Sequence, residues 1–476
     1  MNRPRAINLV ARPLGFSPAY LAFLILFGLL LAFALVSFFK TEWSPVITVS
    51  VYMVALAGVV FLAWQRRNSL SRPNRFDLLL ALFIIIIIIS TVIHGPVSNL
   101  IRRPIHYLPF LVIAPYLCGR LMSRADIELF AYLVKFVGLG ILPILVWDNY
   151  ISPTPIGRHT YFEVDHAALL IANLLAFTLL SVATRGVDNS AWRTLSPTWR
   201  SAIRYSAMGL LVGFIVWVSA RGWVIAILFG FIALLLASIH IRDFRRVFSK
   251  QLVFVLAMVM SVVTVIKLTH ENDIYTKGAQ SLVNELWLAK GSSRLNRGES
   301  LPVENWLNAG LSQPAPTGNS KQIKPAETLT PDSCQILEEG MDSIKIRAVL
   351  YREAIEQFVQ FPIGGRGAGL FGAGSCIGIG GYPHSTILQA LAELGLIGGL
   401  PLIALYMMGV FYLFKVMTRG DRSDKVSTLF LLSCLIMLVV TDQIYGSYFM
   451  ASGTYFLLGV TSSVYDRMLP SKRIDS

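Results

Sequence analysis

Long runs of apolar residues, repeated along the whole chain, constrain its fold more than any other feature of the sequence. One helix needs about 20 apolar residues to cross the hydrocarbon core of a bilayer. The composition agrees, because 55% of the residues are hydrophobic and only 14% are charged, which is unlike a soluble domain. We therefore predict about twelve transmembrane helices. The predicted spans are residues 20–39, 46–63, 78–93, 105–121, 127–146, 164–182, 205–219, 223–239, 252–266, 396–414, 426–440 and 448–464.

Basic residues lie at alternate ends of these spans, and Lys and Arg near span ends are retained on the cytoplasmic side. The N-terminal segment, the loops after the even-numbered spans and the C-terminal segment carry them densely. The opposite short loops carry few, namely Lys40, Arg102, Arg103, Arg158 and Arg221. Both termini are therefore predicted to be cytoplasmic. The net charge of +14 reflects this topology, so it does not indicate a nucleic-acid partner. The first span is too long and too basic-flanked for a removed signal peptide.

The predicted architecture is an all-α polytopic membrane protein with one large, mainly helical domain on the outer side, between the ninth and tenth spans. Residues 1–266 would hold the first nine spans, residues 267–395 the outer domain, and residues 396–476 the last three spans.

The outer domain changes composition along its length. Residues 268–332 are polar, with Pro, Asn, Gly and Ser clusters that predict a surface loop or lid. Residues 342–360 then carry an apolar stripe at helical spacing, which predicts an amphipathic helix lying against the membrane and ended by Pro362. The stripe consists of Ile344, Ala348, Tyr351, Ile355 and Phe358.

A glycine-rich segment follows from residue 363 to His384. Gly367, Gly369 and Gly372 fit a dinucleotide-binding spacing, but no strand precedes them, so we reject that interpretation. The backbone amides could instead cradle phosphate oxygens. A flexible hinge is the alternative, and the sequence does not favour either.

His384 ends this segment and leads directly into the tenth span. It is thus a titratable imidazole at the membrane surface, in a compartment without nucleotide-activated substrates, which favours a lipid-borne substrate. A neutral imidazole there could remove a proton from an attacking hydroxyl. The alternative is a structural histidine. Glu393 lies nine residues on, about 180° around a helix from His384, so we expect it to have a packing or pairing role.

Several arginines of the outer side could hold a diphosphate, because guanidinium binds phosphate bidentately and stays charged. Arg221 lies in a very short outer turn, although it could also extend toward lipid headgroups. Arg347 lies at the edge of the amphipathic stripe. Arg352 is a weaker candidate for diphosphate binding, because Glu356, one helical turn later, can neutralise its charge. Arg366 lies among the glycines and could equally serve solubility.

The four cysteines divide by compartment. Cys118 and Cys434 fall at a span end and inside a span, where small buried side chains are expected. Cys334 and Cys376 fall in the outer domain, where an oxidising environment favours a disulfide. Such a bridge would contribute about 4 kcal/mol in the chain-entropy model. Two free thiols are the alternative.

Three segments resemble the signature of the O-antigen ligase and polymerase superfamily. They are residues 347–354 (Arg-Ala-Val-Leu-Tyr-Arg-Glu-Ala), 361–369 (Phe-Pro-Ile-Gly-Gly-Arg-Gly-Ala-Gly) and 383–398, which begins Pro-His-Ser-Thr. Residues 219–223 (Ser-Ala-Arg-Gly-Trp) are similar to the arginine motif that this family carries between membrane helices.

The resemblance implies a membrane-embedded glycosyltransferase of the C type in the bacterial inner membrane, with a periplasmic active site. Such an enzyme moves a glycan from undecaprenyl diphosphate to a lipid acceptor, with inversion and without a metal or other cofactor. His384 would be the base, and the arginines would hold the diphosphate. We predict an O-antigen ligase whose acceptor is the lipid A-core oligosaccharide.

Two alternatives stay open. An O-antigen polymerase would share the fold and the donor but use a second undecaprenyl-linked glycan as acceptor. A flippase or ion-coupled transporter is less favoured, because the predicted spans carry almost no ionisable residue beyond Lys135.

Overall fold

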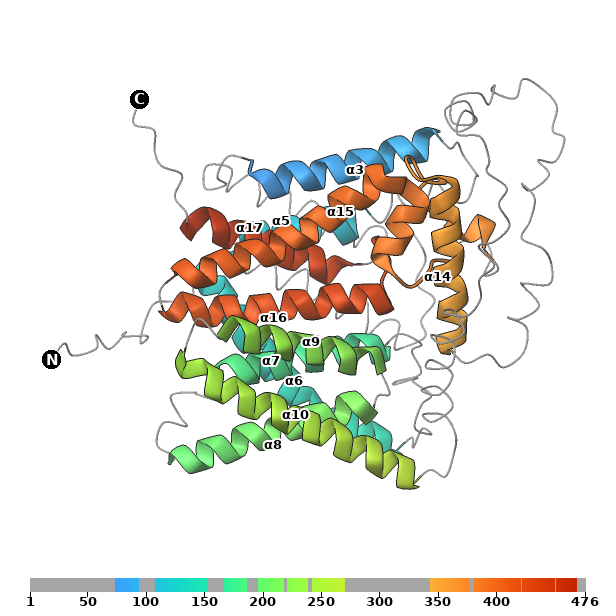
Figure 1. The fold of residues 1–476 in the computed structure, drawn as a ribbon. Helices are drawn as coiled ribbons and strands as arrows, with labels where there is room; N and C mark the ends of the chain where they lie inside the picture. The colour runs from blue at the N-terminus through green and yellow to red at the C-terminus, as the bar shows by residue number, and fades with distance from the viewer. Residues whose placement is uncertain are drawn as a thin grey trace, which may run out of the picture.

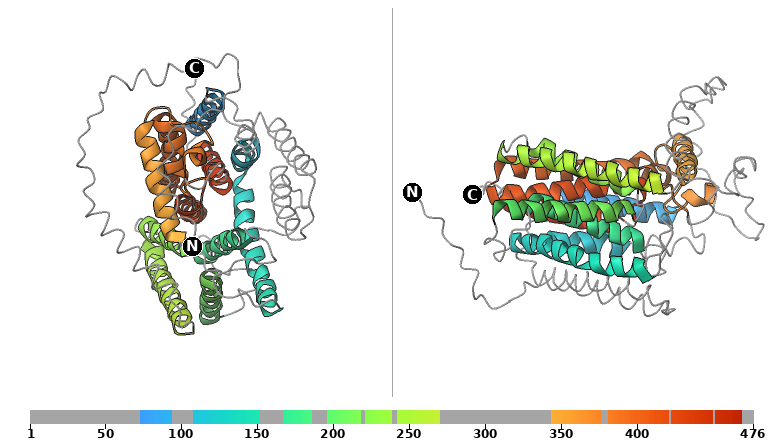
Figure 2. Two further views of the ribbon diagram at one scale, coloured as in Figure 1. Left: turned by 90° about the vertical axis from the view of Figure 1, so that its right-hand side faces the viewer. Right: turned by 90° about the horizontal axis from the view of Figure 1, so that it is seen from below.

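The computed structural model describes residues 73–93, 108–151, 167–185, 196–217, 221–238, 242–269, 343–375, 381–420, 422–449 and 451–468. Within these ranges the chain forms helices joined by turns, and it contains no β-strand. The long helices lie side by side as a bundle, and one helix, α14, runs across one end of it (Figures 1 and 2). The all-helical class predicted from the sequence is confirmed for the described residues.

The elements follow in chain order. They are α3 (Arg75–Ile93), the π-helix η1 (Leu108–Ile113), α5 (Ala114–Leu121), α6 (Arg124–Ile151), α7 (Ala167–Arg185), α8 (Pro197–Trp217), α9 (Arg221–Ser238), α10 (Arg242–Thr269), α14 (Ser343–Gln360), the 3-10 helix η4 (Phe371–Gly374), α15 (Thr386–Arg419), α16 (Arg422–Ile444) and α17 (Ser452–Met468).

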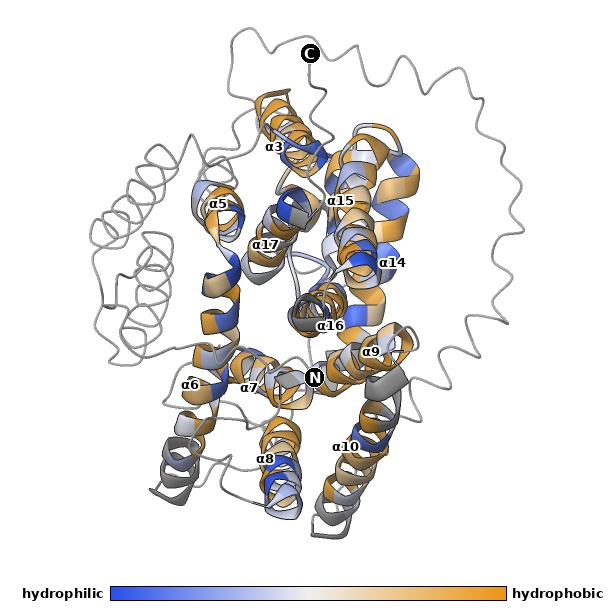
Figure 3. Cartoon of the chain, turned by 90° about the vertical axis from the view of Figure 1, so that its left-hand side faces the viewer, coloured by the Kyte–Doolittle hydropathy of each residue, from blue (hydrophilic) through white to orange (hydrophobic). Residues whose placement is uncertain are grey.

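Helices lie over every predicted span from the third onward. In the described part of the chain, four stretches are long and apolar enough to cross a membrane, and they lie in α3, α10, α15 and α16. Shorter apolar helices occur at 111–121, 171–184 and 222–238, and Figure 3 shows how apolar the bundle helices are. The first two predicted spans lie outside the described residues. The total number of spans and their sidedness therefore stay predictions.

Helices α15 and α16 extend beyond the predicted spans. Helix α15 begins at Thr386 and is kinked at Gly395, so the part after the kink begins at Leu396, where the tenth span is predicted to start. Helix α16 continues past Val440, the predicted end of the eleventh span, to Ile444. The longer helices contain two buried carboxylates, Glu393 and Asp442.

The kink in α15 is tied to the turn that follows α14. Gly395 has a φ of 61°, and a Cβ there would lie 2.2 Å from the carbonyl oxygen of Ile363. Glycine is therefore needed for both its conformation and its lack of a side chain. After the kink, the amides of Leu396 and Ile397 donate to the carbonyls of Pro362 (2.8 Å) and Ile363 (3.2 Å). The turn that follows α14 is thus hydrogen-bonded to α15.

The helix predicted at 342–360 is confirmed as α14 (Ser343–Gln360), and the side that it buries against the protein differs from the stripe predicted to lie against the membrane, which stays a prediction. Leu350 and Ala354 are buried, and they pack with Phe371 and Ala392. Ile355 of the predicted stripe is 50% exposed. Periodicity located the helix, but the buried side is decided by the position of α15 and η4. This packing holds α14 across the start of α15.

Buried charges join the helices at the opposite end of the bundle. Arg120 on α5 is 6% exposed and pairs with Asp77 at the start of α3 and with Asp466 near the end of α17. Tyr116 also donates to Asp77, over 2.7 Å. This network ties α3, α5 and α17 together.

Candidate functional site

His384 lies just before the first turn of α15, in an unusual backbone conformation. Its φ is 56°, the only positive value at a non-glycine residue among those described. A left-handed residue other than glycine costs about 1–3 kcal/mol and persists only where neighbours impose it, as at many active sites. His384 is therefore held in place by the structure around it.

The end of α16 supplies that support. The Ser385 hydroxyl donates to the Gln443 side-chain oxygen over 3.1 Å, and the same oxygen accepts from the Ile387 amide over 3.1 Å. The Thr386 hydroxyl donates to the backbone carbonyl of Asp442 over 2.8 Å. The first turn of α15 is thus fixed to α16, and the histidine before it is fixed as well.

The surroundings of His384 favour the neutral imidazole. Burial lowers its pKa below the usual 6.5, and the positive charge of Arg347 lowers it further. A hydrogen bond to the backbone of Tyr445 acts in the opposite direction. The ring also packs at 4.6 Å from the ring of Tyr382, between centroids. A neutral ring with one nitrogen held by a carbonyl leaves the other nitrogen as a proton acceptor.

Arg347 of α14 lies over Tyr445, with 4.6 Å between its guanidinium carbon and the ring centroid. Its side chain is half-buried, and among the described residues no carboxylate pairs with it. Burial raises the pKa of the hydroxyls of Tyr351 and Tyr382, and the charge of Arg347 opposes that rise in both. A partly desolvated cation among neutral aromatic groups is suited to bind an anion.

Tyr445 also contacts the segment that carries Arg221. The Gly222 amide donates to the Tyr445 hydroxyl over 3.0 Å. A Cβ at Gly222 would lie 2.4 Å from the Tyr445 ring, so only glycine permits this approach. The side chain of Arg221 lies outside the described parts, but its backbone begins α9 beside this contact. Tyr445 therefore joins the Arg221 segment, Arg347 and His384.

The other two predicted arginines do not enter this group. Arg352 is exposed and pairs with Glu356 at 3.8 Å, as their spacing predicts. Arg366 donates its amide to the Ala392 carbonyl over 2.9 Å, and burial lowers the pKa of its guanidinium. Neither makes a described contact with His384 or Arg347.

The glycine segment is neither a phosphate cradle nor a hinge over residues 365–371, because its amides are bonded inside the protein. Glu393 accepts from the amides of Gly369 (2.7 Å) and Phe371 (3.4 Å). The remaining amide bonds run from Gly365 to Phe361, from Arg366 to Ala392, from Gly367 to Glu393, from Leu370 to Gly367, and from Ala368 to the Ser90 hydroxyl. No amide of this stretch is left for a phosphate oxygen.

Glu393 anchors that segment. It is 1% exposed and also accepts hydrogen bonds from the Tyr448 hydroxyl (2.6 Å) and the Gln389 side chain (3.1 Å). Four donors around one carboxylate satisfy its lone pairs despite burial. The packing or pairing role predicted for Glu393 is confirmed.

Sequence reasoning missed residues 442–445, which hold the whole group together. The available signal was a polar Thr-Asp-Gln run at the end of an apolar helix, with Tyr445 two residues after it. An ionisable residue at such a place is a functional hypothesis by default.

The cysteines give a mixed outcome. Cys118 and Cys434 are free and buried, as predicted. Cys334 and Cys376 lie outside the described residues, so their pairing stays a prediction. Within the described ranges no group of three His, Cys, Asp or Glu side chains could hold a metal ion.

Comparison with known families identifies the segment that carries the site. Residues 206–403 match the model of the family described as O-antigen ligase. Over these residues the chain is similar to O-antigen ligases. The matched segment runs from α8 into α15 and includes Arg221, Arg347 and His384, whereas Tyr445 lies beyond it. The match supports a glycosyltransferase-like enzyme of the O-antigen ligase and polymerase type. No curated protein matches the chain.

Proposed function

We propose that this protein is an O-antigen ligase, which transfers a glycan from undecaprenyl diphosphate to the lipid A-core oligosaccharide at the periplasmic face of the inner membrane. The observation that carries the proposal is the cation on α14 that lies close to the segment before α15. Arg347 is half-buried, stacks on Tyr445 and lowers the pKa of His384. A base and an anion-binding cation therefore lie next to each other, at the end of an apolar bundle where a lipid headgroup would lie.

The reaction needs one proton acceptor and one group that stabilises the negative charge of the leaving diphosphate. His384 takes the proton from the acceptor hydroxyl while that oxygen attacks the anomeric carbon of the donor. The bond from this carbon to the diphosphate oxygen breaks as the new glycosidic bond forms, which inverts the centre. The bonding electrons leave with the diphosphate.

Arg347 and Arg221 would stabilise that leaving group. Charge increases on the diphosphate in the transition state, so fixed guanidinium groups in a partly desolvated site lower the barrier. Tyr445 supports this arrangement, because it contacts Arg347 through its ring and the backbone of the Arg221 segment through its hydroxyl. Arg352 and Arg366 are less supported, since the described residues show no contact between either of them and His384, Arg347 or Tyr445.

The hydrogen bonds made by the two buried carboxylates argue against a transporter. Glu393 is surrounded by four hydrogen-bond donors, and Asp442 accepts from Thr454 (2.6 Å) and Tyr406 (3.5 Å). Groups that carry ions or protons across a membrane face a pathway, whereas these two are engaged in packing.

Reconstitution of the purified protein with donor lipid and either of two acceptors tests the proposal. A ligase forms product with lipid A-core and none with a second undecaprenyl-linked glycan, while a polymerase shows the reverse. Loss of donor lipid from one leaflet without any new glycosidic bond would indicate a transporter and contradict the proposal.

A further inference from the structure

The C-terminal end of α14 and the turn after it expose a row of apolar side chains. Ile355 and Val359 of α14 are 50% and 61% exposed, and Phe361 and Ile363 of the turn are 44% and 64% exposed. We call these four residues the apolar edge. Exposed apolar side chains that gather in one place mark a surface that contacts a partner or a membrane.

A hydrogen bond fixes the level of the apolar edge on α15. The Ile397 amide donates to the Ile363 carbonyl over 3.2 Å, so Ile363 lies level with the first turn after the kink. From this level onward α15 exposes apolar side chains along one side, as a helix does where it meets lipid. These side chains are Leu396, Ile397, Leu400, Met407, Phe411 and Phe414. The apolar edge therefore begins where the exposed apolar side of α15 begins.

A second hydrogen bond fixes the same turn on α3. The Ala368 amide donates to the Ser90 hydroxyl over 3.1 Å, and Ser90 lies about 4.5 Å along the helix before the last residue of α3. Val92 and Ile93, closer to that end, are apolar and 73% and 71% exposed. Both α3 and α15 are long and apolar enough to cross a membrane. The turn thus lies at the depth of two helix ends that still expose apolar side chains.

The side of α14 that carries the apolar edge faces the end of the bundle. Tyr351, Ile355 and Val359 follow one another at four-residue steps, so they share one side of the helix. The Tyr351 hydroxyl donates to the Gln443 carbonyl at the end of α16 over 2.9 Å, and α14 runs across this end of the bundle (Figure 1). Ile355 and Val359 therefore lie on the side of α14 that is turned toward the helix ends.

The backbone of the turn suits a position at the edge of a membrane. Polar backbone groups at membrane depth need partners inside the protein, and the amides of residues 365–371 have them. The carbonyls of residues 361–363 also accept hydrogen bonds. Gly364 is exposed and Arg366 is charged, which limits the turn to a shallow depth where headgroups are within reach.

We infer that the apolar edge lies in the lipid bilayer, at the boundary between headgroups and acyl chains. The leaflet is the one on the α14 side of the bundle, which is predicted to be the outer one. Helices that lie on membranes bury their apolar face about 5–10 Å into this boundary. Lipid is the occupant that fits, because the exposed apolar side of α15 needs it at the same level. The edge would then hold α14, and Arg347 with it, at a fixed height on the bilayer. The inference does not depend on the proposed reaction.

Spin labels at single introduced cysteines test this inference. Labelled Ile363→Cys and Val359→Cys proteins are reconstituted into vesicles of phosphatidylethanolamine and phosphatidylglycerol. Electron paramagnetic resonance then measures collisions of each label with oxygen, which concentrates in hydrocarbon, and with a nickel chelate, which stays in water. Both labels should show an oxygen-to-nickel collision ratio several-fold higher than that of a label in water.

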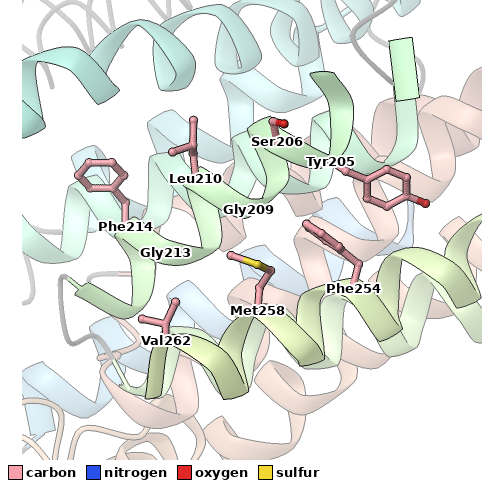
Figure 4. Close-up of a pocket in the computed structure, with 9 residues that line it drawn as sticks. All are labelled: Tyr205, Ser206, Gly209, Leu210, Gly213, Phe214, Phe254, Met258 and Val262. Carbon is pink, nitrogen blue, oxygen red and sulfur yellow. The ribbon is translucent and has the colours of Figure 1, made fainter. Parts of the chain in front are cut away.

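Two further variants give the reference values. Glu356→Cys reports a label in water, because Glu356 lies on the charged, exposed side of the same helix and pairs with Arg352. Leu210→Cys reports a label in hydrocarbon. Leu210 is 57% exposed in the middle of a predicted span, among the apolar side chains between α8 and α10 in Figure 4. The unsubstituted protein, labelled in parallel, gives the background from the native cysteines, and size-exclusion elution identical to wild type shows that each variant is folded.

The collision ratios decide the matter without any transfer assay. Ratios above that of Glu356→Cys at both Ile363 and Val359 support the inference. A ratio equal to that of Glu356→Cys at either position would place the apolar edge in water and overturn it. Few collisions with either reagent would also overturn it, because protein, from another part of this chain or from a second copy, would then cover the edge.

Discussion

Tyr445 should be the residue whose loss most clearly reveals how the site is assembled. Its hydroxyl accepts a hydrogen bond from Gly222 over 3.0 Å, and its ring lies 4.6 Å from the guanidinium of Arg347. Tyr445→Phe removes only the first contact, which is worth about 1 kcal/mol. We therefore expect kcat/KM to fall about fivefold.

Tyr445→Ala removes both contacts. The stacked cation contributes about 1–2 kcal/mol more, so the expected loss is roughly 30- to 150-fold. Because Tyr445 acts through Arg347 and the Arg221 segment, the loss should fall on kcat and on donor binding. The acceptor KM should stay unchanged.

The assay is transfer in proteoliposomes with each lipid substrate varied in turn. Tyr132→Ala is the matched control, because Tyr132 stacks on Lys135 at 5.5 Å in α6 but lies outside the site. A folded Tyr445→Ala protein with kcat/KM within about twofold of wild type would refute the reasoning. A twofold change corresponds to less free energy than either contact is expected to contribute.

Three further predictions concern residues chosen from the sequence. Arg347→Ala and Arg221→Ala should each lose orders of magnitude in rate, and Lys should restore little because it lacks the bidentate fork; full rescue of both in the transfer assay would reduce them to simple charges. The lowered pKa of His384 keeps its base form populated below pH 6.5, so the acid limb of kcat/KM should have its midpoint below that value. The limb should move to higher pH in Arg347→Gln, and a limb already above 6.5 in wild type would contradict the assignment. Cys334→Ser and Cys376→Ser should lower thermal stability and activity equally, with the double variant no worse than either single one. Mass spectrometry of the unreduced protein finding both thiols free would exclude the bridge.

Helix positions were largely predictable from the sequence, because twenty-residue apolar runs and a 3.6-residue stripe are local properties. The helix at residues 343–360 was found almost to its ends. The residues that it packs against the protein could not be predicted, since they depend on where Phe371 and Ala392 lie in space. The part of α15 before the kink at Gly395 was not counted in the tenth span, because the polar residues Ser385, Gln389 and Glu393 interrupt the apolar pattern, while the tertiary structure satisfies them.

The candidate site was predictable as a list of residues but not as an arrangement. His384 and Arg347 were chosen for their chemistry and position, and both have Tyr445 as a neighbour. The glycine-rich backbone suggested either a phosphate cradle or a flexible hinge, yet the amides of residues 365–371 are bonded to Glu393 and its neighbours. Tyr445 was missed, since its role depends on contacts with residues far away in the chain.

The most direct test of the central claim is product formation by wild type and His384→Ala, reconstituted with undecaprenyl diphosphate-linked glycan and lipid A-core, with donor binding measured in the same samples. We expect wild type to form the inverted lipid A-core glycoside, and His384→Ala to bind donor equally well but form no product. Wild-type turnover by His384→Ala would contradict the proposed mechanism.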